Sequence, residues 1–187
     1  MAALLRMVRG SVAAVAISLV LVPAHPAAAR ASGAPVYGGP ISRTQVMIRA
    51  LDWLRRDIPY SQDNGKARKD INGGRRYRPD CSGFISMAWA IDTRQPGLGR
   101  ALTTWELPRV STRVRWTAMR RGDILLHLVP GNRAEEHVRL MQTWADAAHT
   151  RAVIIEQSGR TTGMRRRVVT VSEARGRYLP YRYRRIY

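Results

Sequence analysis

The chain contains a single cysteine, Cys81, in residues 78–89, which read R-P-D-C-S-G-F-I-S-M-A-W. This pattern predicts a loop that becomes a helix at the cysteine, with Asp80 as the N-cap. A thiol at a helix start lies beside unpaired N–H groups and the positive end of the helix dipole. Because both favour the thiolate, we expect Cys81 to be a reactive nucleophile rather than an inert core residue.

A nucleophilic cysteine needs a base that accepts its proton and later protonates the leaving group. His137 is the favoured base, because it begins a predicted strand directly after the polar residues 132–136. The other two histidines outside the N-terminal segment are less suitable. His127 lies inside an apolar run, and His149 lies in a polar turn.

A third polar residue can hold the base in one orientation. Glu156 follows the apolar run 153–155, and a strand there that pairs beside His137 would bring the carboxylate to the imidazole. An acidic partner fixes the ring's tautomer and favours the imidazolium. Gln157 is the alternative and points to the opposite face of the strand. Asp80 and Asp123 are less suited, because each has a capping or turn role.

The elements that must position these residues are helices first and strands later. Helices are predicted from residue 43, after the capping box Ser42–Gln45, to a point before Pro59, and over 81–91. A surface loop is expected over 60–79, with a turn at 72–74, and a short helical turn at 103–108. Strands are predicted over 124–129, 137–144, 152–157, 168–171 and 181–184. This order predicts an α+β domain with helices packed on an antiparallel sheet.

Apolar residues at helical spacing predict the buried faces of the two helices. They are Met47, Leu51 and Leu54, with Trp53 beside them, and Phe84, Ala88 and Ile91. The tryptophans are expected in the core or in the walls of a groove rather than as a stacking platform: Trp53, Trp89, Trp105, Trp116 and Trp144.

The N-terminus has the layout of a secretory signal peptide. Arg6 and Arg9 precede an apolar run over 12–22, and small residues follow at 27–29. The apolar run is shorter than the roughly 20 residues that a spanning helix needs. We therefore expect residues 1–29 to be removed on export. The protein would then be secreted, with the cell wall as a further expected location, and would contact the membrane only during export.

The rest of the chain is expected to be one domain over 42–187, preceded by a linker at 30–41 that is rich in Ala, Gly and Pro. The formal net charge of the full chain is +19, and such a surface attracts polyanions. Arginine replacing lysine through compositional bias is an equally weighted explanation. Since no recognisable nucleic-acid module accompanies the basic residues, specific nucleic-acid binding is not expected.

Several segments resemble the NlpC/P60 family of cysteine peptidases, and the similarity extends over about residues 43–187. They are D-C-S-G-F at 80–84, G-D-I-L at 122–125, His137-Val138 at the start of the histidine strand, Ile154-Ile155-Glu156 at the third polar position, and I-P-Y at 58–60. The chain departs from the family pattern in having Glu156 where histidine is common and Arg139 where glycine is common. Residues 72–74 only loosely match the family's aromatic-Gly-Gly element.

The resemblance implies a papain-like fold and hydrolysis of peptidoglycan stem peptides, usually at the bond from the γ-carboxyl of D-glutamate to the next diamino acid. We expect a monomer without metal or cofactor, whose partners are stem peptides and, because of its basic surface, anionic wall polymers. The implied catalytic residues are Cys81, His137 and Glu156, and those expected near the substrate or the oxyanion are Tyr60, Asp80 and Ser82.

Two alternatives remain open. The chain could be a non-catalytic, cationic protein that binds cell wall or another polyanion on a degenerate peptidase fold. It could also transfer an acyl group through the same thioester.

Overall fold

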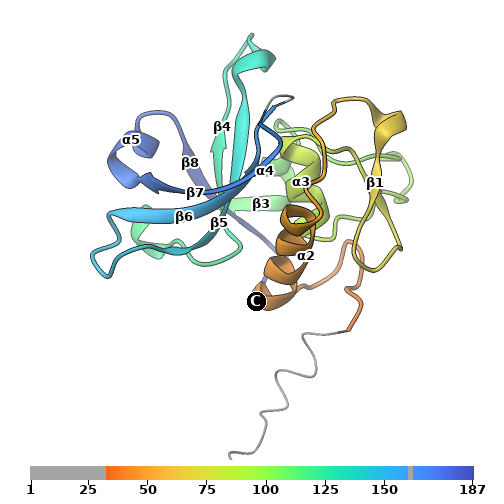
Figure 1. Cartoon of the computed structure of the whole chain (residues 1–187), viewed down its shortest axis with the longest axis horizontal. Helices are drawn as coiled ribbons and strands as arrows, with labels where there is room; N and C mark the ends of the chain where they lie inside the picture. Colours follow the sequence, from red (N-terminus) through yellow and green to blue (C-terminus); the bar gives the residue numbers. More distant parts are fainter. Residues whose placement is uncertain (1–32, 160–161) are drawn as a thin grey trace, which may run out of the picture.

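A six-stranded antiparallel sheet forms the centre of the structure, a computed structural model that describes residues 33–159 and 162–187 (Figure 1). The strand order is β3–β8–β4–β5–β6–β7. The strands are β3 (Ser111–Arg113), β4 (Ile124–His127), β5 (His137–Trp144), β6 (Arg151–Gln157), β7 (Met164–Thr170) and β8 (Leu179–Tyr183). The predicted α+β class and antiparallel sheet are therefore confirmed, whereas the predicted signal peptide lies outside the described residues.

Helix α2 (Arg43–Arg55) begins at the predicted capping box and ends before Pro59, as expected. Its predicted buried face was wrong in one position, because Leu51 is 39% exposed. The residues that face the core are instead Val46, Ala50 and Trp53, all fully buried. They share one face at a spacing of four and three residues, and this face packs against the next helix.

Helix α3 (Cys81–Ala88) lies between α2 and the sheet, so every residue after Cys81 is buried (Figure 1). Asp80 is the N-cap, and its carboxylate accepts a hydrogen bond of 2.7 Å from the Gly83 N–H. A β-carbon at Gly83 would lie 1.8 Å from the Arg78 carbonyl oxygen, so only glycine fits there. Asp80 and Gly83 of the D-C-S-G sequence thus fix the start of this helix.

The polar segment 60–79 is more ordered than the expected surface loop, because it contains a hairpin of β1 (Arg68–Lys69) and β2 (Arg76–Tyr77). Its buried Asp70 forms an ion pair of 2.9 Å with Arg49 of α2. Short helical segments complete the fold: η1 (Asn64–Lys66), α4 (Leu107–Val110), η2 (Trp116–Ala118), η3 (Arg133–Glu135) and α5 (Val171–Arg175). Of these, only α4 overlaps a predicted helical turn, at 103–108, and strand β3 was not predicted.

Residues 33–41, expected as part of a linker, pack on the domain. The Gly38 N–H donates to the Ala90 carbonyl at 2.7 Å. Ile41 is fully buried and forms a parallel bridge with Ile186 near the C-terminus. The C-terminus consequently lies beside the start of α2 (Figure 1).

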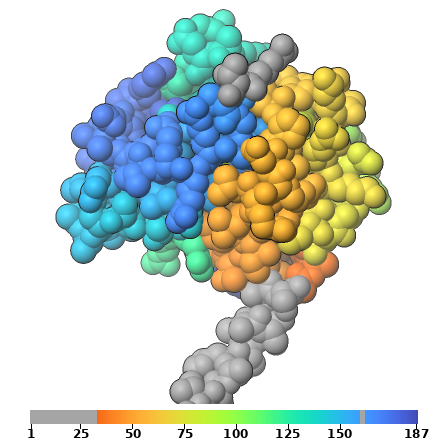
Figure 2. Space-filling view, in the orientation of Figure 1, coloured from red at the N-terminus to blue at the C-terminus, as the bar shows by residue number. Residues whose placement is uncertain are grey.

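Apolar side chains cover both faces of the sheet. One core lies between the sheet and helices α2 and α3, and a smaller one lies on the opposite face, around Leu125, Met141 and Ile154. In Figure 2 the N-terminal half and the C-terminal half occupy opposite sides of the molecule, with β7 adjoining α2. No helix among the described residues is both long enough and apolar enough to cross a membrane.

Candidate active site

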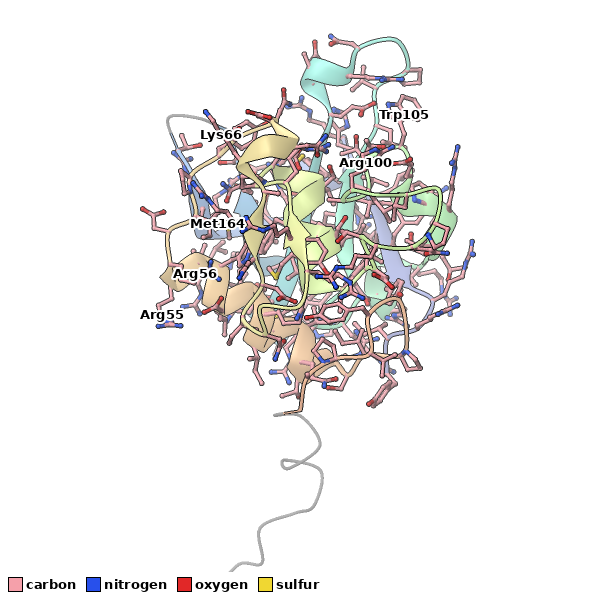
Figure 3. All side chains as sticks on the ribbon, turned by 90° about the vertical axis from the view of Figure 1, so that its right-hand side faces the viewer. Arg55, Arg56, Lys66, Arg100, Trp105 and Met164 are labelled. Atoms are coloured by element: carbon pink, nitrogen blue, oxygen red, sulfur yellow. The ribbon has the colours of Figure 1, made fainter. Side chains whose placement is uncertain are left out.

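A cleft of about 790 Å³ opens where α3 and β5 begin and β6 ends. Its lining includes all six residues that the sequence analysis assigned to a site: Tyr60, Asp80, Cys81, Ser82, His137 and Glu156. The cleft wall also includes Arg100 and the partly exposed Trp105, which lie on one side of α3, with Lys66 on the other side (Figure 3).

Cys81 is the first residue of α3, and its side chain is partly exposed to the cleft. Helix α3 packs against β5, and His137, the first residue of β5, lines the same cleft. Cys81 and His137 thus face one cleft from the first residues of two packed elements. The sequence placed these residues more than 50 positions apart, and the sheet brings them together.

The expectation of an acidic thiol was wrong for the free protein. Burial, together with the carboxylate of Asp80, raises the pKa of Cys81 to about 12, although hydrogen bonds from Val138 and Ser82 and the charge of Arg78 act to lower it. The helix N-terminus favours the thiolate, but loss of solvation and a neighbouring negative charge outweigh it. The thiol is therefore protonated at neutral pH, and ionisation needs a base.

His137 has one ring nitrogen occupied by an acidic partner. Its Nε2 lies 2.7 Å from a carboxylate oxygen of Glu156. An ionised carboxylate only accepts hydrogen bonds, so Nε2 must carry the proton. In the neutral ring, Nδ1 is then the basic nitrogen that can receive a proton.

Glu156 is almost completely buried and is held by two arginines as well as by His137. Arg139 donates to it at 2.9 Å and Arg167 at 2.6 Å. Burial acts to raise the pKa of Glu156, but the hydrogen bonds from His137 and Arg167 and the neighbouring positive charges hold it at about 2. The carboxylate is thus ionised at neutral pH.

The two arginines are site residues that the sequence analysis did not find. Arg139 lies two residues after His137 and so on the same face of β5, a relation that strand alternation could have indicated. Arg167 lies on β7, and its approach to Glu156 depends on the β6–β7 register, which pairs Glu156 with Arg165.

Gln157, the alternative to Glu156, does not contact the histidine. Its amide nitrogen donates to the Ile58 carbonyl at 2.8 Å, and its side chain is fully buried. The expected contact with His137 is therefore made by Glu156 and not by Gln157.

The residues around the sulfur form a polar network. Asp80 pairs with Arg78 at 2.6 Å, and the Ser82 hydroxyl, which is buried, lies within 3.4 Å of Asp80. Burial and the nearby Cys81 and Asp80 raise the pKa of the half-buried Tyr60. The N–H of Cys81 has no acceptor among the described residues, so it can donate to a developing oxyanion.

The other candidates lie elsewhere. The Nδ1 of His127 lies 2.6 Å from the Arg177 carbonyl oxygen, and His149 stacks on Trp144. Asp123 is fully buried and paired with Arg182, in the turn role expected for it. Within the described part of the chain, no group of three or more His, Cys, Asp or Glu residues is arranged to hold a metal ion.

Comparisons with known proteins do not assign this chain to a family. No family model matches it, and no curated protein matches it. Among solved structures, the crystal structure of Ly7917 aligns with a TM-score of 0.39 and 14% sequence identity. The alignment covers 72% of this chain and 60% of Ly7917, and at that TM-score it supports no assignment of fold or activity.

Proposed function

We propose that the protein is a secreted cysteine peptidase or amidohydrolase with a papain-like NlpC/P60 fold, acting on peptidoglycan stem peptides. One observation carries the proposal: Cys81 at the start of α3 and His137 at the start of β5 line the same open cleft, where Glu156 holds the histidine in one tautomer. The resemblance of residues 80–84 to the family signature supplies the substrate class.

The proposed reaction begins with His137 acting as a general base. As the sulfur attacks the amide carbon, its proton passes to Nδ1, and Glu156 stabilises the imidazolium that forms. The N–H of Cys81 stabilises the oxyanion, and a single donor of this kind is worth about 3–4 kcal/mol. His137 then protonates the leaving amine, and water hydrolyses the thioester.

The charges of the cleft suit a peptide that carries carboxylates. Arg109, Arg133 and Arg165 line it, and no carboxylate of the described residues lies within 4.0 Å of them. Guanidinium groups bind carboxylates in a bidentate geometry. Stem peptides offer such groups along their length, so these arginines would orient the chain across Cys81.

Digestion of purified peptidoglycan tests the proposal. Wild-type protein should release peptide fragments identifiable by mass spectrometry, whereas Cys81→Ala and His137→Ala should release none above the level without enzyme. Acid quenching during turnover should reveal an added acyl mass on Cys81 in the wild type. Identical fragment patterns for wild type and Cys81→Ala would refute the assignment.

A non-catalytic binding protein is the second candidate, and two observations favour it. The net charge is +19, and burial together with the carboxylate of Asp80 raises the pKa of the Cys81 thiol. Such a protein would bind the wall, form no acyl adduct, and bind equally well as Cys81→Ala. Added amine acceptors in the same assay would reveal acyl transfer as a new amide product.

A further inference from the structure

A second hollow lies beside the cleft, between the β1–β2 hairpin and residues 93–101. It has a volume of about 420 Å³, and no acidic residue is among the described residues that line it. We call it the basic pocket, and its six cationic residues are Lys69, Arg75, Arg76, Arg78, Arg94 and Arg100. Arg78 and Arg100 also line the cleft, so the two hollows adjoin.

Half of this positive charge is neutralised from outside the pocket. The ion pairs are Arg75–Asp92 at 2.6 Å, Arg78–Asp80 at 2.6 Å and Arg100–Glu106 at 2.8 Å. The other three cations, Lys69, Arg76 and Arg94, are exposed and have no carboxylate within 4.0 Å among the described residues. The pocket therefore brings three uncompensated positive charges around one space, and an anion there would relieve their repulsion.

The shape of the hollow favours a chain over a flat surface. Gly73 and Gly99 line it, and a β-carbon at either would meet no atom within 4 Å, so the space beside them is open. A planar membrane cannot enter a concave pocket, whereas a flexible polymer can. Figure 3 shows the side of the molecule that carries the hairpin, with Arg100 on the neighbouring loop.

We propose that the basic pocket binds phosphate groups of a phosphodiester-linked anionic polymer. One guanidinium can pair with one carboxylate, whereas three unpaired cations around one pocket suit a ligand that carries several negative charges. Each phosphodiester group carries one negative charge shared by two free oxygens, which cations can approach from different sides. The shared Arg78 and Arg100 would leave the bound polymer beside the entrance of the cleft. This binding does not depend on the proposed hydrolysis.

The test measures binding of a fluorescent poly(glycerol phosphate) oligomer by anisotropy, using the protein without its N-terminal 29 residues and the full chain in parallel. The pocket variant Lys69→Gln/Arg76→Gln/Arg94→Gln removes three positive charges. We expect about fivefold weaker binding for each, and about 100-fold for the three together. Binding should also weaken with added salt, less steeply in this variant.

The control variant Arg113→Gln/Arg115→Gln/Arg184→Gln removes the same charge from exposed positions outside the pocket. Because charges beyond about 10 Å are screened at 0.1 M salt, it should lose about threefold or less. Equal losses in the two variants would overturn the proposal in favour of general surface attraction. Circular dichroism and thermal melting show that each variant is folded before it is compared.

Two further arms separate the chemistry of the ligand. If polyglutamate of equal charge binds as tightly as poly(glycerol phosphate), phosphate is overturned as the ligand. If single-stranded DNA binds more tightly than poly(glycerol phosphate), and the pocket variant loses DNA binding to the same extent, the ligand is nucleic acid instead of the proposed polymer. Cys81→Ala should bind like the wild type. Its peptidoglycan digestion fails independently, so failure of the catalytic proposal and failure of this one are distinguishable.

Discussion

Replacing Glu156 by glutamine removes one negative charge from the cleft while keeping the size of the side chain. The carboxylate is 2% exposed and accepts from His137, Arg139 and Arg167 at 2.7, 2.9 and 2.6 Å. Glutamine has one oxygen for these donors and presents an NH₂ group to the rest. If the oxygen stays toward His137, the NH₂ faces Arg167, whose partly exposed side chain can turn to solvent.

The expected loss of stability follows from the pKa of Glu156, which falls from the ordinary 4.5 to about 2 in the folded protein. That difference corresponds to about 3 kcal/mol of folding free energy at neutral pH. Because the folded pKa is the lower one, the contribution is complete above pH 4.5 and disappears as the pH falls through 2. The stability gap between wild type and Glu156→Gln should therefore narrow in acid.

Urea unfolding of both proteins at pH 7 and pH 3 measures this gap. We also expect kcat to fall by about 100-fold to 10,000-fold, because His137 loses the partner that fixes its tautomer. Met141→Ala serves as a matched control: Met141 is fully buried in the smaller core and does not line the cleft, and its truncation should destabilise by about 2–5 kcal/mol without loss of turnover. A gap that stays constant between pH 7 and pH 3, or equal activity losses in both variants, would refute the reasoning.

Three other perturbations have expected outcomes. Burial and the Asp80 charge raise the pKa of Cys81 to about 12. Alkylation of Cys81 by iodoacetamide at pH 8 should therefore be at least about tenfold slower than alkylation of free cysteine. An alkylation rate that reaches a plateau below pH 7 would instead show that the thiol proton has already passed to His137. Asp80→Asn keeps the capping acceptor and removes the charge, so alkylation at pH 8 should become faster with little change in melting temperature; an unchanged rate would exclude Asp80 as a cause. Arg49→Met leaves the buried Asp70 unpaired and should cost about 3–5 kcal/mol in urea unfolding, part of which the added Asp70→Asn should restore.

The sequence predicted those helices and strands whose formation depends mainly on residues close together in the chain. The capping box Ser42–Gln45 begins α2, and Asp80 caps α3. The strand predicted at 137–144 matches β5, because its residues already favour an extended chain. The hairpin within 60–79 was missed because its polar strands are only two residues long. The buried ion pair between Asp70 and Arg49 of α2, which holds this segment in place, forms only in the folded chain. Strand β3 was missed for a similar reason: Ser-Thr-Arg has no apolar pattern, and pairing with β8 makes it a strand.

Some features of the candidate site likewise follow from neighbouring residues, and others only from the tertiary structure. The sequence by itself determined that a thiol begins a helix and that Asp80 caps it, because both depend on the geometry of one turn. Only the tertiary structure decided that Glu156 rather than Gln157 holds His137, since strand register selects the face that a side chain occupies.

The charge state of the site was likewise decided by the tertiary structure. The two arginines on Glu156 and the raised pKa of Cys81 arise from groups brought together from separate strands and from burial, and a pKa depends on these surroundings rather than on adjacent residues. The basic pocket has the same origin, because the hairpin and residues 93–101 are apart in the sequence and adjoin only in the fold.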